Sequence, residues 1–291
     1  MDWEVLKSSF TMVGYKIIYV FSVPIIWTIC NALCLKTLIN HPIAFHQILF
    51  TQITGDAYNA VTPFGGLGGV PVKIKHLTNW ISVHEASEVI IRDQLVHTLS
   101  GMAFTAFLSL LALGILPLED NYLIPFLVVG IIFSVLSILL TLLIFSSKPN
   151  KLLSKLLEKV KIVSDYRSNP LKKQVFFQAI SFKLLGRIMG LTELFVIFIL
   201  LGFTPSLIDL LAVLTMLTVS SSIMFIFPQG IGVHEASIAG AFKMLGYSTT
   251  LGLSFGLIRR ARTIFWVLFG VVLHLGYVFF SKKKASAVTT K

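Results

Sequence analysis

YLIPFLVVGIIFSVLSILLTLLIF, residues 122–145, contains no Asp, Glu, Lys, Arg, His, Asn or Gln. An apolar run of about 20 residues is long enough to cross the hydrocarbon core of a bilayer as an α-helix. Backbone N–H and C=O groups find no water in that core, and a helix satisfies them within the segment itself. The stretch therefore predicts a membrane-spanning helix, and similar runs lie on both sides of it.

The whole chain has the composition of a membrane protein. Of its 291 residues, 55% are hydrophobic and 13% are charged, with a mean hydropathy of +0.86. A soluble domain carries about 25% charged residues, so this chain has too few to cover a water-soluble surface. We expect one all-α polytopic membrane domain over residues 1–291, with roughly seven transmembrane helices. Their expected positions are about 12–35, 42–62, 94–116, 122–145, 174–203, 206–227 and 263–280.

The net charge of +11 does not indicate a nucleic-acid partner, because Lys and Arg collect in the cytoplasmic loops of membrane proteins. The longest polar stretch, 147–173, contains NKLLSKLLEKVKIV, with leucines and lysines largely on opposite helical faces. We expect a cytoplasmic basic amphipathic loop on an anionic membrane surface; an ordinary solvated loop helix is the alternative. A polar tail is expected at 282–291, and a prokaryotic plasma (inner) membrane is the expected location.

Two glycine-rich breaks interrupt the apolar pattern. They are TPFGGLGGVPVKIKHL (62–77) and PQGIGVHEAS (228–237), and each precedes an expected short helix and then an arginine, Arg92 or Arg259. Paired interruptions in the two halves of a transporter point to its binding site. We therefore expect two re-entrant or broken-helix elements related by an internal repeat. Their expected hinge residues are Gly65, Gly66, Gly68, Gly69, Pro228, Gly230 and Gly232.

Glycine suits such breaks for two physical reasons. It permits sharp turns and close approach of the backbone. A half-helix that starts there also presents free N–H groups and the positive end of its dipole to an anion. The alternative is close helix packing, and Gly65 with Gly69 fits the small-xxx-small spacing.

The two breaks also carry a family resemblance. GDAYNAVTPFGGLGGVPVKIKHL (55–77) and FPQGIGVHEASIAGAFKMLGYS (227–248) resemble the two signatures of the lysylphosphatidylglycerol synthase transmembrane-region family. That family includes the flippase half of the multiple peptide resistance factor. The resemblance implies a helical bundle with re-entrant elements that moves a polar-headgroup lipid between leaflets. The family's acyltransferase activity belongs to a separate soluble domain that this chain does not resemble, so no enzyme activity is expected.

Ionisable side chains inside a membrane are costly and mark functional sites by default. The candidate headgroup-binding residues are Arg92, Arg259, Glu235, Asp56 and Lys73. A planar guanidinium binds phosphate bidentately, whereas a carboxylate can pair with an arginine or bind a cationic headgroup. The alternative for the arginines is snorkelling to the interface.

A further set of charges lies in the fifth expected span. Glu193 follows Lys183 and Arg187, which are four residues apart and share a helical face. Their alternatives are structural ion pairs or a position below the membrane. Metal chemistry is not expected, because His84-Glu85 and His234-Glu235 each lack the second histidine of the zincin pattern. No P-loop is present either, and we expect no cofactor.

Three functions fit these observations. The first is a flippase for an aminoacylated phospholipid, a glycolipid or a polyprenyl-phosphate-linked lipid. The second is a membrane enzyme or accessory subunit in lipid-linked sugar or phospholipid modification, and the third is a lipid-binding scaffold without transport. The expected partners are lipids with anionic or aminoacylated headgroups, together with a second copy of the chain or a lipid-modifying enzyme.

Overall fold

The computed structural model describes residues 11–62, 68–116, 120–145, 171–223 and 232–289, and every regular element in these ranges is a helix. The helices before residue 120 are η1 (Gly14–Lys16), α2 (Ile17–Ser22), α3 (Pro24–Leu38), α4 (Phe45–Val61), α5 (Gly69–Leu77) and α6 (Val83–Ile115). Those after it are α7 (Asp120–Phe145), α9 (Lys173–Ile188), α10 (Gly190–Leu200), α11 (Leu207–Ile223), α12 (Val233–Met244) and α13 (Thr249–Thr289). The predicted all-α class is therefore confirmed for the described part of the chain.

Four helical stretches are long and apolar enough to cross a membrane. They are Thr11–Leu38, Val83–Ile115, Leu123–Phe145 and Thr249–Phe279. The apolar part of α11 is shorter, at Leu207–Ser221. The remaining expected spans correspond to α4 and to the pair α9 and α10, so the count of seven stays a prediction. The expected loop at 147–173 lies almost entirely outside the described residues, and the expected tail at 282–291 continues α13 as helix to Thr289.

The second half of the chain repeats the order of elements of the first half. A broken helix, α2 with α3, precedes α4, the short α5 and the long α6; we call these elements the N-terminal half. A second broken helix, α9 with α10, precedes α11, the short α12 and the long α13, which form the C-terminal half. Each glycine-rich break falls between a helix and a short helix, where the sequence places it. The two helix breaks lie at Pro24, which begins α3, and at Gly190, which begins α10.

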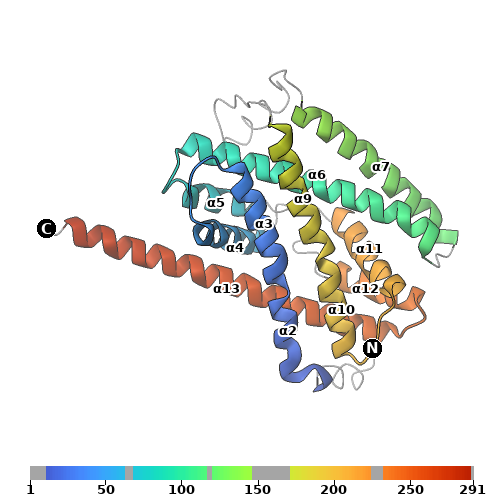
Figure 1. The fold of residues 1–291 in the computed structure, drawn as a ribbon. Helices are drawn as coiled ribbons and strands as arrows, with labels where there is room; N and C mark the ends of the chain where they lie inside the picture. The colour runs from blue at the N-terminus through green and yellow to red at the C-terminus, as the bar shows by residue number, and fades with distance from the viewer. Residues whose placement is uncertain (1–10, 63–67, 117–119, 146–170, 224–231, 290–291) are drawn as a thin grey trace.

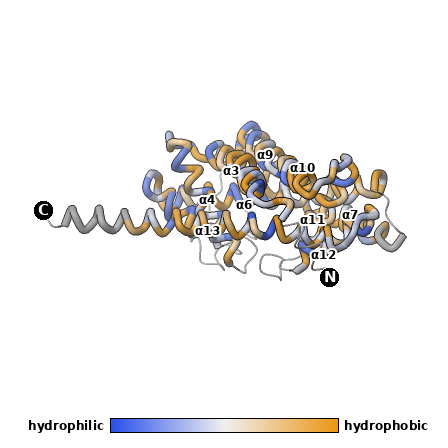
Figure 2. Tube along the Cα trace, turned by 90° about the horizontal axis from the view of Figure 1, so that it is seen from below, coloured by the Kyte–Doolittle hydropathy of each residue, from blue (hydrophilic) through white to orange (hydrophobic). Residues whose placement is uncertain are grey.

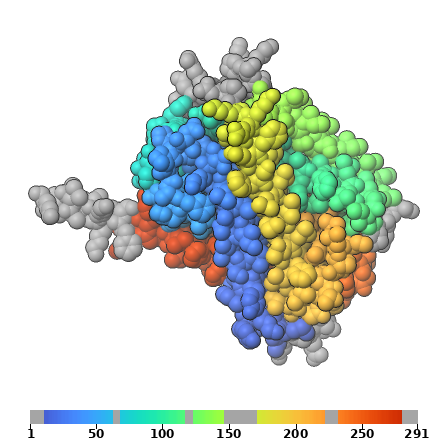
Figure 3. All heavy atoms as spheres, in the orientation of Figure 1, coloured from blue at the N-terminus to red at the C-terminus, as the bar shows by residue number. Residues whose placement is uncertain are grey.

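Several helices of each half pack against helices of the other half. α4 packs against α13 of the other half, α11 packs against α6, and α3 packs against α9. Figure 1 shows α6 and α13 running in opposite directions, as do α3 and α9. Figure 3 shows α2 and α3 side by side with α9 and α10 on one face. This reciprocal pattern is the one that an approximate two-fold relation between the halves produces.

Two helices, α6 and α12, begin with the same five residues. The pentapeptide VHEAS begins both α6, at residue 83, and α12, at residue 233. Ser82 caps α6, because its hydroxyl accepts a hydrogen bond of 3.2 Å from the N–H of Glu85. At α12 the glutamate side chain is the acceptor instead: the Glu235 carboxylate accepts a hydrogen bond of 2.9 Å from the N–H of Gly232. Gly232 has a φ of +84°, a conformation that a residue with a Cβ rarely adopts.

Two large apolar clusters contain residues from both halves. In the first, Leu35, Ile48, Leu77 and Ile90 of the N-terminal half are almost completely buried with Phe176 of α9. In the other cluster three aromatic rings are buried together, with centroids 5.3 Å apart for Phe198 and Phe242 and 5.1 Å apart for Phe198 and Phe255. The second cluster also contains Leu108 of α6, so apolar packing joins the two halves on either side of their polar contacts.

The outer surface of the bundle is apolar. Side chains of α7 such as Ile124, Ile138 and Leu142 expose more than half of their area, as do Leu268 and Val272 of α13. Figure 2 shows hydrophobic residues along much of the helical trace, interrupted by shorter hydrophilic stretches. A soluble monomer does not expose apolar area on this scale, whereas a lipid-facing surface does.

Candidate functional site

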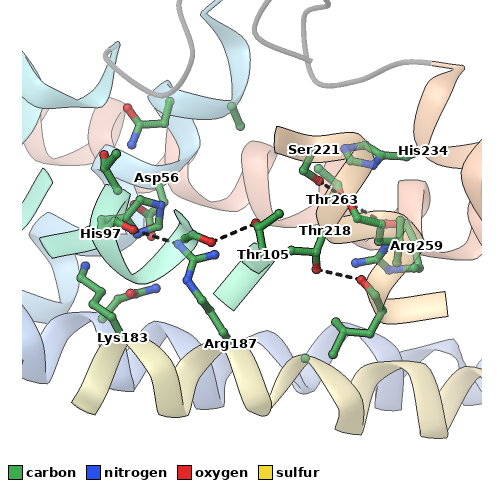
Figure 4. Close-up of a pocket in the computed structure, with 18 of the residues that line it drawn as sticks. Asp56, His97, Thr105, Lys183, Arg187, Thr218, Ser221, His234, Arg259 and Thr263 are labelled. Carbon is green, nitrogen blue, oxygen red and sulfur yellow. Dashed lines mark hydrogen bonds between the residues drawn. The ribbon is translucent and has the colours of Figure 1, made fainter. Parts of the chain in front are cut away.

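A cavity of about 760 Å³ lies between the two halves and is lined by residues from α3 to α13. Its lining combines charged and polar side chains with apolar ones such as Phe133 and Leu214. Figure 4 shows side chains of both halves pointing into it, among them Asp56 and Lys183 at one end and Arg259 at the other. The charged residues that line it are Asp56, Lys73, Asp93, Lys183, Arg187, Glu235, Arg259, Arg260 and Arg262.

The first charged group at the cavity is built on α4 and α5. Gln52 and Asp56 lie one helical turn apart on α4, and the Gln52 amide donates to both Asp56 carboxylate oxygens at 2.9 and 2.8 Å. Lys73 of α5 reaches this pair, with its Nζ 3.1 Å from Asp56 Oδ1 and 3.1 Å from Gln52 Oε1. Gly55 makes room for the lysine, because a Cβ there would fall 2.3 Å from Lys73 Cε.

An ion pair between Asp93 of α6 and Lys183 of α9 connects the halves. Their charged atoms are 2.7 Å apart, and the side chains are only 5% and 2% exposed. Lys73 Nζ lies 4.0 Å from the same carboxylate, and the Cys34 thiol donates to it at 3.5 Å. Two lysines and two carboxylates thus form one network, in which Asp56 is 42% exposed and the other three side chains are buried. Pairing of the buried charges offsets the cost of removing them from water.

Arg187 enters the cavity one turn after Lys183 on α9. Its Nε donates to the Ser100 hydroxyl at 3.1 Å, and its Nη2 donates to the His97 carbonyl at 3.0 Å. Gly101 gives the guanidinium its space, because a Cβ there would lie 2.9 Å from Nη2. Both of these partners are uncharged, which distinguishes Arg187 from the other lysines and arginines that line the cavity.

Glu193 of α10 lies at the other end and receives two arginines. Arg259 donates to its carboxylate at 3.3 and 3.4 Å, and Arg262 donates at 2.9 Å from Nε with Nη2 at 2.8 Å. The Glu193 side chain is 2% exposed. Arg262 also lies over the ring of Trp27, 5.3 Å from its centroid, in cation–π contact. One buried carboxylate thus orients two guanidiniums.

Glu235 completes this end of the cavity. Its carboxylate accepts from Arg260 at 2.7 and 2.9 Å, and from the N–H of Gly232 at 2.9 Å. Gly256 of α13 lets α12 approach closely, since a Cβ there would lie 3.2 Å from Glu235 Cα. His234 lines the same region, and its Nδ1 is buried without a hydrogen-bond partner in the described part of the chain. Figure 4 shows its ring beside Ser221.

Four of the five predicted headgroup residues line this cavity: Asp56, Lys73, Glu235 and Arg259. Arg92 is not among the lining residues. Its Nη2 forms an ion pair of 2.5 Å with Glu88, one turn earlier on α6. The next residue, Asp93, faces the cavity instead, because consecutive residues of a helix point about 100° apart.

Sequence reasoning gave too little weight to several cavity residues. Lys183 and Arg187 share a helical face with spacing four, and Glu193 follows in the same apolar run. That spacing was the available signal, because three charges in one apolar segment must face one another or water. Arg260 and Arg262 were visible beside Arg259, but only the tertiary structure assigns them separate carboxylates.

The predicted hinge glycines have different local roles. Gly69 lies against α4, where its N–H donates to Asn59 Oδ1 at 2.6 Å and a Cβ would fall 2.0 Å from the Gly55 carbonyl oxygen. A Cβ at Gly68 would fall 1.9 Å from Thr62 Oγ1. Gly232 has the positive φ described above. The other predicted hinge residues, Gly65, Gly66, Pro228 and Gly230, lie outside the described residues.

The cavity can bind and orient a charged, polar group. Among the described residues, no three His, Cys, Asp or Glu side chains are placed to hold a metal ion. Its polar lining includes guanidiniums, ammoniums, carboxylates, hydroxyls, amides and imidazoles, and the guanidiniums suit recognition of a phosphate-bearing group.

The family model described as the lysylphosphatidylglycerol synthase TM region matches residues 1–271 of this chain. The match covers nearly all of both halves, including the two glycine-rich breaks. Comparisons with curated proteins and with solved structures find no match.

Proposed function

Because this chain belongs to the lysylphosphatidylglycerol synthase transmembrane-region family, we propose that it is a flippase that moves a polar-headgroup lipid between the leaflets of a membrane. The family assignment and the apolar helices make it an integral membrane protein with a lipid-related function. We further propose what this function is: the protein transfers the headgroup across the hydrocarbon core without changing any covalent bond of the lipid.

The observation that carries the proposal is the charged cavity between the two halves. Ionisable groups at membrane depth are costly and face the interior of a bundle where they serve a pathway or site. A volume of about 760 Å³ falls in the range of small-molecule sites, about 300–1,000 Å³. A lipid headgroup fits such a space, while its acyl chains can stay in the surrounding lipid.

The headgroup route that we propose runs through the cavity between the two halves. Residues of α4 and α5 from one half and of α11 and α12 from the other line the cavity, and α4 packs against α13 as α11 packs against α6. Transporters built from repeats alternate access by rocking one repeat against the other around a fixed site. In our proposal the ion pair between Asp93 and Lys183 is one contact that such a movement rearranges.

The setting of this activity is part of the same proposal. We place the protein in the plasma membrane of a prokaryote, with residues 147–173 on the cytoplasmic side. A lipid-modifying enzyme that supplies the lipid, or a second copy of the chain, is the proposed protein partner.

The test is lipid translocation by purified protein in vesicles. Wild type is reconstituted with acyl-labelled fluorescent phosphatidylglycerol, and a membrane-impermeant reductant measures the label that reaches the outer leaflet. We expect faster exposure than in protein-free vesicles, and at least about tenfold slower exposure for Lys73→Gln and Arg259→Gln, each of which removes a charge-assisted contact. Lys173→Gln, on an exposed residue at the start of α9, is the matched control.

Two outcomes would overturn the proposal. Protein-bearing vesicles that expose label no faster than empty ones, while the protein still binds lipid, would assign the chain to the scaffold function. A chemically altered lipid, found by mass spectrometry after incubation in detergent where no leaflets exist, would assign it to the enzyme class.

A further inference from the structure

The charges around the cavity do not balance. Six Lys or Arg side chains line it, against three Asp or Glu side chains, and Glu193 adds a fourth carboxylate behind Arg259 and Arg262. The two glycine-rich segments missing from the described residues, 63–67 and 224–231, contain no ionisable side chain. Within the described part of the chain, the cavity therefore carries an excess of positive charge.

Every carboxylate at the cavity already contacts a cation. Asp56 is paired with Lys73, Asp93 with Lys183, and Glu235 with Arg260. Glu193 receives both Arg259 and Arg262. A cationic headgroup would have to displace one of these lysines or arginines, leaving a buried positive charge uncompensated, which is strongly unfavourable.

The excess charge has a defined location at Arg187. Each of the other five cations lies within 4.0 Å of a carboxylate, whereas Arg187 donates hydrogen bonds to the Ser100 hydroxyl and the His97 carbonyl. A guanidinium has five N–H donors in a fixed fork. These two bonds use Nε and one donor of Nη2, and the Nη1 donors have no carboxylate partner among the described residues.

Arg187 lies close to α6 at the wall of the cavity. The absence of a side chain at Gly101 lets the guanidinium pack against that helix, and both residues line the cavity. Figure 4 shows Arg187 pointing into the cavity, with Thr105 and Thr218 between it and Arg259. An uncharged, hydroxyl-bearing region thus separates Arg187 from the arginine cluster at the other end.

We propose that the headgroup accepted by this cavity is net anionic and phosphate-bearing, with the phosphate bound by Arg187, and that net cationic aminoacylated headgroups are disfavoured. The inference rests on the proposed function, since it names the class of lipid that occupies the same cavity. A phosphate suits the site because it accepts parallel hydrogen bonds from a guanidinium and neutralises a charge that the protein leaves uncompensated.

The test is competitive lipid binding in detergent, followed by native mass spectrometry. Purified protein is offered equal amounts of phosphatidylglycerol, phosphatidylcholine and lysyl-phosphatidylglycerol with the same acyl chains. We expect wild type to retain phosphatidylglycerol in preference to both others. Arg187→Gln should lower phosphatidylglycerol retention about tenfold or more, the size expected for one charged hydrogen bond, while phosphatidylcholine retention stays unchanged.

Two further variants separate charge from folding and from helix position. Arg187→Lys keeps the charge and should recover part of the preference, because an ammonium lacks the planar fork. Lys173→Gln removes a positive charge from the exposed start of the same helix and should bind as wild type does. An unchanged thermal midpoint for Arg187→Gln shows that the loss is local.

A soluble competitor identifies what the site recognises. Glycerol 1-phosphate at millimolar concentration should displace part of the bound phosphatidylglycerol from wild type if the phosphate alone is recognised. No displacement would mean that the site requires the lipid, with the Arg187→Gln effect still assigning the phosphate contact.

The inference is overturned if wild type retains lysyl-phosphatidylglycerol as well as phosphatidylglycerol, or if Arg187→Gln leaves the preference intact. This assay has no leaflets, so it is independent of transport. A protein that shows the preference but moves no lipid in vesicles would refute the flippase proposal and keep the binding inference. A protein that moves lipids of any headgroup charge equally well would support the flippase proposal and refute the binding inference.

Discussion

Lys183 of α9 and Asp93 of α6 form a buried ion pair of 2.7 Å that joins the two halves of the molecule. The same carboxylate has Lys73 at 4.0 Å and the Cys34 thiol at 3.5 Å. Helices α3, α5 and α6 of the N-terminal half and α9 of the C-terminal half therefore meet at one group of atoms. This ion pair and three other features of the protein can be tested by substitution.

Breaking this ion pair from one side should destabilise the protein strongly. Asp93→Asn leaves the Lys183 charge without its nearest partner, and Lys183→Met leaves the Asp93 charge with only the more distant Lys73. Each substitution is expected to cost about 3–5 kcal/mol, as the loss of one member of a buried pair does. Thermal unfolding of the purified protein in detergent measures this as a lower midpoint.

The double variant Asp93→Asn/Lys183→Met provides the control. It should be more stable than the sum of the two single losses predicts, because no uncompensated charge remains. Glu85→Gln, in the more exposed pair with His41, should cost no more than about 1 kcal/mol. Strict additivity of the two buried substitutions would contradict the ion-pair interpretation.

Glu193 should be essential to the arrangement of the arginines. Glu193→Gln removes the charge that Arg259 and Arg262 share, so the two guanidiniums repel each other without compensation. We expect lipid translocation at least about tenfold slower, the effect of losing one charged hydrogen bond or more. Glu193→Asp keeps the charge and should be milder. Wild-type rates and an unchanged thermal midpoint for Glu193→Gln would contradict this role.

The contact between Gly55 and Gly69 should not tolerate a methyl group. A Cβ at Gly69 would lie 2.0 Å from the Gly55 carbonyl oxygen, and backbone cannot yield as a flexible side chain can. Overpacking of this kind costs about 1–3 kcal/mol. Gly240→Ala in α12, where nothing lies within 4 Å of the added Cβ, is the matched control. A Gly69→Ala midpoint as high as that of the control would disprove the close contact.

The membrane orientation can be read by cysteine labelling. Cys30 and Cys34 are buried at 5% and 0% exposure, so neither should react with a bulky maleimide in the folded protein. A cysteine introduced by Lys155→Cys lies in the stretch proposed to face the cytoplasm. A membrane-impermeant maleimide should label it in inside-out vesicles and leave it unlabelled in intact cells; labelling of intact cells would reverse the proposed topology.

The candidate site was partly predictable. Intramembrane charge and the paired breaks indicated Asp56, Lys73, Glu235 and Arg259, all of which line one cavity. Arg92 and Asp93 show the limit of this reasoning, because both are ionisable neighbours and only helix rotation decides which of them faces inward. A sequence states the spacing of residues along a helix, but the helix against which each face packs depends on contacts with distant segments.

The amino-acid sequence alone indicates an apolar, all-helical chain with two glycine-rich interruptions, because hydropathy and backbone geometry are local properties. It also places the charges within each helix. The tertiary structure decides how they are paired: Lys183 with Asp93 across the halves, two arginines with Glu193, and Arg187 with uncharged partners among the described residues. This pairing depends on which helices of one half contact which helices of the other half, and those contacts depend on packing over the whole molecule. The excess positive charge at Arg187 is therefore a property of the fold.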